Sequence, residues 1–100
     1  MFIGFKVYKT IDTILKNKKL FVLFTQVYIF GSSLNKLYPN DIDLLLIYKD
    51  FNDKILFEKN KISNFLENIL KIPIDITILS ERELKETRFL KNTYRYRKIK

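Results

Sequence analysis

The 100-residue sequence contains neither cysteine nor histidine. Without cysteine, the chain has no disulfide framework and no thiolate nucleophile. Without histidine, it has no imidazole base, no Ser-His-Asp triad and no zinc site built from histidine and cysteine. Any catalysis must therefore come from carboxylates, hydroxyls, lysine or arginine, with a hard metal ion as the candidate cofactor.

Long apolar runs are also absent. Lysines or aspartates interrupt each apolar stretch before it approaches the roughly 18 residues that a membrane-spanning helix requires. The N-terminus lacks an early basic region followed by a small-residue cleavage site, and no Gly/Ser linker or internal repeat divides the chain. Because 47% of the residues are hydrophobic, a real core is possible. We expect one compact cytoplasmic domain over residues 1–100.

Positive charge is in excess. The net charge is +8, and residues 91–100, the basic tail, contribute five positive charges and no acid. This excess favours an anionic partner such as nucleic acid, a nucleotide or an acidic protein surface. Within the tail, Tyr94 and Tyr96 alternate with Arg95 and Arg97, a pattern that can stack bases while contacting phosphates. RNA is therefore a candidate partner, and the alternative is a tail that is only solvated.

Helices and strands are expected to alternate along the chain. Apolar residues at helical spacing predict helices over about residues 6–18 and 53–71. Ser80 and Glu83 have the spacing of a capping box, which predicts a third helix from near residue 81. Short runs rich in β-branched and aromatic residues predict three strands, over residues 26–31, 41–49 and 72–79.

Three aspartates interrupt the predicted strands. Asp41 and Asp43 share one face of the second strand, about 6.6 Å apart along the chain, and Asp75 lies between isoleucines in the third strand. If these strands are neighbours, the three carboxylates can converge. Their proximity would raise their pKa values or require a cation, and oxygen-only ligands suit Mg²⁺ or Mn²⁺. For Asp41 the alternative is ordinary turn chemistry after Pro39 and Asn40.

Gly31 and Ser32 follow the first predicted strand directly. A glycine at such a point lets backbone N–H groups approach a phosphate, and a hydroxyl adds a donor. The alternative is a simple turn. The following residues, 33–40, contain Pro39 and are predicted to form a loop or a short helical turn.

The stretch FGSSLNKLYPNDIDLLL, residues 30–46, resembles the signature of the DNA polymerase β-type nucleotidyltransferase superfamily. In that signature a strand-terminal Gly-Ser precedes an Asp-x-Asp strand, and a later strand adds a third acidic residue. The length and element order look most like the minimal nucleotidyltransferases, which in many bacteria and archaea act as antitoxins beside a HEPN-domain toxin. The resemblance covers about residues 10–90. It implies an α+β, polymerase β-like fold in which a small mixed β-sheet packs against helices.

The resemblance also implies a role for each motif residue. Gly31 and Ser32 would hold the triphosphate of ATP. Asp41 and Asp43 would bind two Mg²⁺ ions, with Mn²⁺ as the alternative metal, and Asp75 would be the third metal-binding and catalytic carboxylate.

The activity implied is transfer of a nucleoside monophosphate, AMP from ATP, to a hydroxyl of a macromolecular partner, often a tyrosine of a HEPN-type toxin. The chain departs from the usual motif in one segment: Leu34, Asn35 and Lys36 stand where the family has a small residue, an arginine and a second glycine. Lys36 can supply positive charge there or be a solvated loop residue. The alternative functions are RNA nucleotidyl transfer, a non-catalytic antitoxin and a nucleic-acid-binding module.

Overall fold

The computed structural model describes residues 4–93 and 95–100. Four strands in the described residues form one sheet in the order β3-β2-β1-β4. β1 pairs antiparallel with both β2 and β4, whereas β2 and β3 run parallel. The sheet is therefore mixed, as the family resemblance implied. The strand bounds are β1 Gln26–Phe30, β2 Ile42–Tyr48, β3 Ile74–Ser80 and β4 Tyr96–Lys98.

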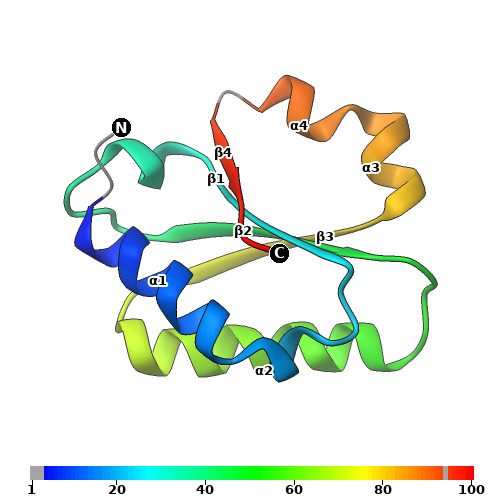
Figure 1. Ribbon diagram of the computed structural model, residues 1–100, viewed down its shortest axis with the longest axis horizontal. Coiled ribbons are helices and arrows are strands. Elements are labelled where there is room, and N and C mark those ends of the chain that lie inside the picture. Colours follow the sequence, from blue (N-terminus) through cyan, green and yellow to red (C-terminus); the bar gives the residue numbers. More distant parts are fainter. Residues whose placement is uncertain (1–3, 94) are drawn as a thin grey trace.

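Helices cover both faces of the sheet (Figure 1). Two longer helices, α1 (Phe5–Lys16) and α2 (Lys54–Leu70), lie on one face. Two short ones, α3 (Glu81–Thr87) and α4 (Phe89–Asn92), lie on the other. Single 3₁₀ turns follow α1 and β1, at η1 (Lys18–Phe21) and η2 (Ser32–Asn35). Among the described helices, none combines the length and the hydrophobicity of a membrane-spanning segment.

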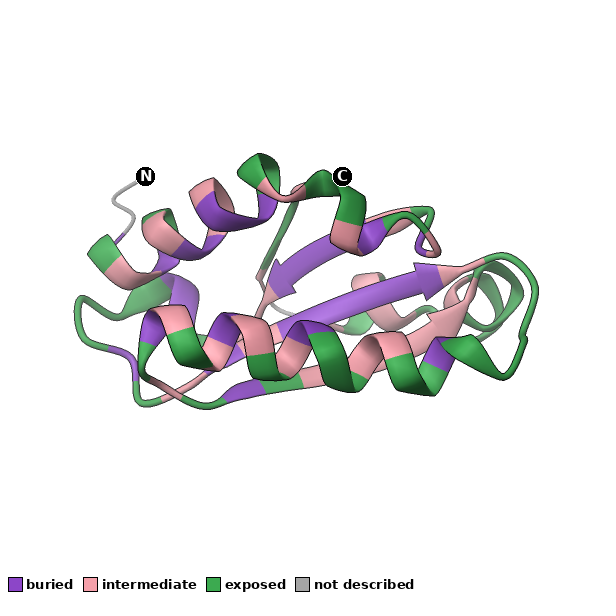
Figure 2. Cartoon of the chain, turned by 90° about the horizontal axis from the view of Figure 1, so that it is seen from below, coloured by how far each residue is buried: buried purple, intermediate pink, exposed green. Residues whose placement is uncertain are grey.

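The central strand β2 is buried on both faces because its side chains alternate between two hydrophobic clusters (Figure 2). Leu44 and Leu46 belong to the larger cluster, which includes residues of α1 and α2. Leu45 and Ile47 belong to the smaller one, against which residues of α3 and α4 pack. This double burial explains the nearly continuous apolar run that predicted the strand.

The predicted elements are confirmed to within about two residues at their ends. The capping box is also present: the Ser80 hydroxyl accepts from the Glu83 N–H at 3.0 Å, and Glu83 Oε1 accepts from the Ser80 N–H at 2.9 Å. The short helical turn expected after Gly31 is η2.

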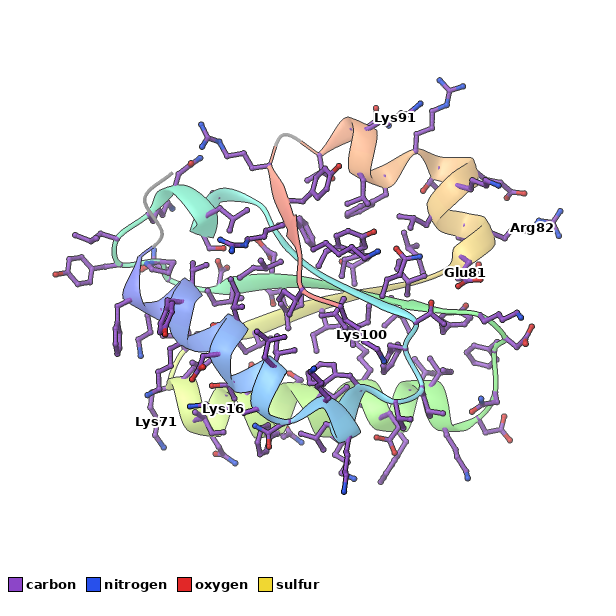
Figure 3. All side chains as sticks on the ribbon, viewed as in Figure 1. Lys16, Lys71, Glu81, Arg82, Lys91 and Lys100 are labelled. Carbon is purple, nitrogen blue, oxygen red and sulfur yellow. The ribbon has the colours of Figure 1, made fainter. Side chains whose placement is uncertain are left out.

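Strand β4, which lies within the basic tail, was not predicted from the sequence. Residues 96–98 pair with β1, from Phe30↔Tyr96 to Tyr28↔Lys98. The Lys100 ammonium donates to the carbonyls of Phe21 and Phe24 at 3.0 and 2.7 Å (Figure 3). Three basic and aromatic residues carry little strand signal of their own, and it is the edge of β1 that supplies the backbone partners. Tyr94, expected to stack bases, lies outside the described residues.

Candidate functional site

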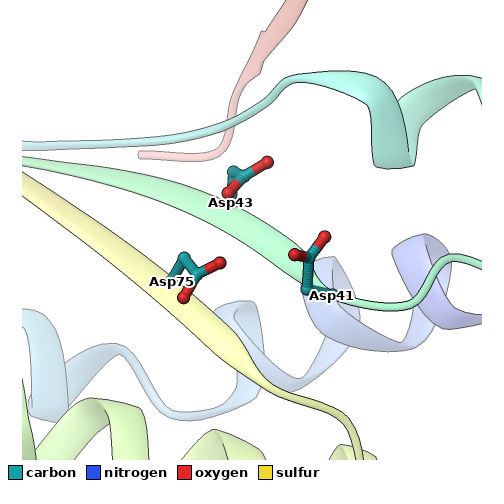
Figure 4. Close-up of side chains that lie close together, drawn as sticks. All are labelled: Asp41, Asp43 and Asp75. Atoms are coloured by element: carbon teal, nitrogen blue, oxygen red, sulfur yellow. The ribbon is translucent and has the colours of Figure 1, made fainter.

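Strand register brings the three predicted carboxylates together. β2 and β3 are parallel neighbours, and Asp43 lies opposite Asp75. Residues paired across adjacent strands point to the same face, and Asp41 precedes Asp43 by two positions, so all three side chains share that face. One carboxylate oxygen from each lies within 4.8 Å of the others (Figure 4). We call these three residues the aspartate cluster.

The aspartate cluster lies on the same sheet face as α3 and α4, where the apolar covering ends. Further along β2, Leu45 and Ile47 are fully buried on this face. Asp41 and Asp43 are only half-buried and Asp75 is exposed. A molecule in solution can therefore reach the carboxylates while the strands beneath them stay fixed by the core.

The cluster is electrostatically unfavourable when all of its members are ionised. Burial raises the pKa of Asp43, and the nearby charges of Asp41 and Asp75 raise this pKa further. A divalent cation among the three carboxylates would offset both effects. The donors are all carboxylate oxygens, as Mg²⁺ and Mn²⁺ prefer, and their spacing suits these ions.

Gly31 lies directly against the aspartate cluster. It has φ +89°, and a Cβ built on it would lie 2.8 Å from Asp43 Oδ2. Only glycine adopts this conformation readily and leaves room for the carboxylate. The Gly31 N–H donates to the Arg95 carbonyl at 3.1 Å, so this amide is already engaged. The lack of a side chain at Gly31 therefore lets Asp43 Oδ2 lie close to the backbone at this point.

Ser32 is exposed at the start of η2, beside Gly31, where a phosphate could reach its hydroxyl. Ser33, which is 1% exposed, was not among the predicted site residues. Among the described residues, no hydrogen-bond partner lies within reach of its buried Oγ. The sequence feature that could have indicated Ser33 is its position as the second serine of Gly-Ser-Ser. Lys36 lies past the end of η2 and is exposed.

Arg95, predicted only as part of the basic and aromatic pattern of the tail, lies beside Gly31. The Arg95 carbonyl accepts the hydrogen bond from the Gly31 N–H, and the Nε atom of the Arg95 guanidinium is buried. The local sequence pattern could not place Arg95 next to Gly31, because this position depends on the pairing of β4 with β1.

Comparison with known proteins relates the chain to one family. Residues 9–100 match the family model of the nucleotidyltransferase domain. The fold is similar to a chain in the solved complex of a tri-AMPylated HEPN toxin with an MNT antitoxin from Shewanella oneidensis, with 16% identity, 93% coverage of this chain, 71% of that chain and a TM-score of 0.59. A second crystal structure from Shewanella oneidensis matches with 16% identity, coverage of 92% and 71%, and a TM-score of 0.55. No curated protein matches the chain significantly.

Proposed function

Since the chain belongs to the nucleotidyltransferase domain family, we propose that it transfers AMP from ATP to a hydroxyl of a partner protein, a HEPN-type toxin. The observation that carries the proposal is the convergence of Asp41, Asp43 and Asp75 beside Gly31. The similar Shewanella complex, in which a tri-AMPylated HEPN toxin is bound to an MNT antitoxin, supports the choice of acceptor.

The residues of the site suit this reaction. Asp41 and Asp43 would hold the Mg²⁺ or Mn²⁺, with Asp75 as the third ligand. When bound, the metal supplies charge stabilisation at the phosphates and lowers the pKa of the acceptor hydroxyl. The hydroxyl of Ser32, which is exposed at the start of η2, would donate to a phosphate oxygen.

The reaction forms one bond and breaks one. The acceptor oxygen bonds to the α-phosphorus of ATP, the bond from that phosphorus to the α–β bridging oxygen breaks, and pyrophosphate leaves. Asp75 is the most exposed member of the aspartate cluster and lies on the edge strand of the sheet, so it takes the proton of the incoming hydroxyl.

The direct test is transfer of label from [α-³²P]ATP, with Mg²⁺, to the product of the neighbouring gene. We expect wild-type protein to label this partner, and Asp41→Asn and Asp43→Asn to abolish the labelling. Asp50→Asn removes the same charge from an exposed position and serves as the matched control. Neutralisation of the partner that survives both cluster substitutions would identify a non-catalytic antitoxin and overturn the proposal.

Metal binding is measurable without any acceptor. Mn²⁺ or Mg²⁺ at about ten times its Kd should stabilise the wild-type fold by about 1.4 kcal/mol, because the ion binds the folded cluster and not the unfolded chain. Thermal unfolding of Asp43→Asn and Asp75→Asn should not respond to the ion. An equal response in wild type and both variants would place the metal elsewhere.

A further inference from the structure

The outer edge of β3 lies beside the aspartate cluster. Among the described strands, β3 pairs with β2 and with no other. The Ile42 N–H donates to the Pro73 carbonyl at 3.0 Å, so this carbonyl is directed toward β2. Because these directions alternate along a strand, the backbone groups of Ile76 and Ile78 are directed away from the sheet.

Side chains form hydrogen bonds with the outward backbone groups at both ends of this edge. At one end, the Ile74 N–H donates to Glu67 Oε2 at 2.8 Å, and the Ser63 hydroxyl donates to the Ile74 carbonyl at 3.4 Å. At the other, the Ser80 N–H donates to Glu83.

Between these ends, Ile76 and Ile78 present two N–H and two C=O groups, which we call the β3 edge. Within residues 4–93 and 95–100, no loop or side chain is seen to bond to these four groups. An unprotected edge of this kind is a template for another strand, and proteins usually blunt such edges with lysine, proline or a bulge. Ile74–Ser80 contains neither lysine nor proline, and its only charged residue is Asp75.

We propose that the β3 edge binds an extended segment of the acceptor protein as a fifth strand and presents a tyrosine of that segment to the aspartate cluster. This inference rests on the proposed function. Main-chain hydrogen bonds would provide the affinity, as in other cases where a peptide adds a strand to a sheet.

Geometry selects the acceptor residue. Adjacent strands lie about 4.8 Å apart, so a residue opposite Asp75 on the added strand would be one spacing from Asp75 and two from Asp43. Aromatic side chains reach neighbours on an adjacent strand, so a tyrosine that leans toward Asp75 can bring its hydroxyl to the cluster. The hydroxyl of serine or threonine stays beside its own strand. The tyrosine oxygen would then form the bond to the α-phosphorus as pyrophosphate leaves, with its proton passing to Asp75.

Charge argues against a second copy of this chain as the occupant. Two chains of net charge +8 repel each other, which disfavours pairing of one β3 edge with another. Lys71, exposed where the chain leaves α2 and approaches β3, adds positive charge at the end of the strand nearest Asp75 (Figure 3). The favoured segment is therefore neutral next to its tyrosine, which would lie beside the three carboxylates, and acidic toward its ends.

Amide hydrogen exchange of the full chain, followed by NMR, tests the docking. The probe is a synthetic peptide of alternating threonine and valine with a central tyrosine and a glutamate at each end. In the free protein, we expect the amides of Ile76 and Ile78 to exchange faster than those of Thr77 and Leu79. Saturating peptide should slow exchange at Ile76 and Ile78 by about tenfold or more. Exchange rates that do not change with peptide would overturn the proposal. Protection that depends only on protein concentration would also overturn it, because it would indicate pairing between two copies of the chain.

Two substitutions at one position separate docking from packing. Ile78→Pro removes an outward N–H that the β2–β3 ladder does not use, whereas Ile78→Ala keeps the N–H and loses similar packing. We expect Ile78→Pro to lose at least about tenfold more peptide labelling than Ile78→Ala, with equal Mn²⁺ stabilisation in both. If Ile78→Pro does not fold, the wild-type protein is tested with two peptides, one N-methylated along one backbone edge and one along the other. Only the peptide whose methylated edge would face β3 should lose binding.

The outcomes distinguish this inference from the proposed function. If the peptide protects the amides of Ile76 and Ile78 from exchange, but neither its tyrosine nor the neighbouring gene's product is labelled, the proposal of AMP transfer is wrong. If that product is labelled equally well by Ile78→Pro and Ile78→Ala, and the peptide leaves exchange unchanged, the β3 edge is not the docking site although the transfer activity holds. A peptide with serine in place of tyrosine should bind without being labelled.

Discussion

Asp43 occupies a position that is unfavourable for the metal-free fold. Its raised pKa means that the folded protein binds this proton more tightly than the unfolded chain does. Ionised Asp43 therefore lowers the free energy of unfolding at neutral pH. This loss of stability diminishes as the pH falls through the raised pKa toward the ordinary value of 3.8.

Asp43→Asn should accordingly be more stable than wild type at neutral pH without divalent cations. The difference between the two proteins should shrink as the pH falls, because wild-type Asp43 then becomes neutral as well. Urea unfolding across a pH series measures both effects, and Asp50→Asn at an exposed site is the control. If Asp43→Asn is less stable than wild type at neutral pH, ionised Asp43 does not destabilise the fold.

Gly31 is constrained by both its backbone and its neighbour. Gly31→Ala should destabilise the fold by about 1–3 kcal/mol, because it places a side chain at φ +89° and a Cβ 2.8 Å from Asp43 Oδ2. Denaturant unfolding measures the loss. The same substitution in an Asp43→Ala background should cost less, since the clash is gone and only the backbone term remains. Equal costs in both backgrounds would show that the contact is unimportant.

At the scale of elements, the start of α3 depends on its capping box. Ser80→Ala should reduce the free energy of unfolding by about 1 kcal/mol, because the Glu83 amide loses its acceptor. Thr87→Ala, at an exposed position of the same helix, should change it by less than about 0.5 kcal/mol. Similar losses in both variants would argue against a specific cap.

The same box sets a pH dependence. Hydrogen bonds from the Ser80 backbone and side chain lower the pKa of Glu83. The stabilisation linked to this group is therefore present above its ordinary pKa of 4.5 and is lost as the pH falls through the lowered value. In Ser80→Ala, NMR titration should show the Glu83 pKa shifted back toward 4.5.

For the whole molecule, the end of the chain is structural as well as basic. Deleting residues 96–100 should lower the free energy of unfolding by more than about 2 kcal/mol, because β1 loses a neighbouring strand and Ile99 no longer packs against the core. The combined change Arg97→Gln and Lys98→Gln, at exposed positions, should leave stability within about 0.5 kcal/mol. Equal stability of the deletion and wild type would contradict a structural role for β4.

The charge variant also provides the cleaner test for RNA. It removes two exposed positive charges while keeping β4, whereas a deletion would remove a strand and a candidate RNA contact together. Weaker RNA binding with a smaller salt dependence in this variant would indicate a direct contact with phosphates.

Most elements, and the identity of the acidic residues, could be predicted from the sequence. Apolar periodicity placed α1, α2 and the three main strands, and Ser80 and Glu83 marked the start of α3, because these signals act between residues a few positions apart. Aspartates inside apolar strands pointed to a site before any strand order was known.

How these parts meet depends on long-range packing and strand pairing. The parallel pairing of β2 with β3 puts Asp43 opposite Asp75. The pairing of β4 with β1 engages the Gly31 amide with Arg95, and the end position of β3 leaves its outer backbone groups facing outward. None of this follows from the strands taken separately, because hydrogen bonding and charge proximity between distant segments depend on strand order and register, which the whole packed core selects.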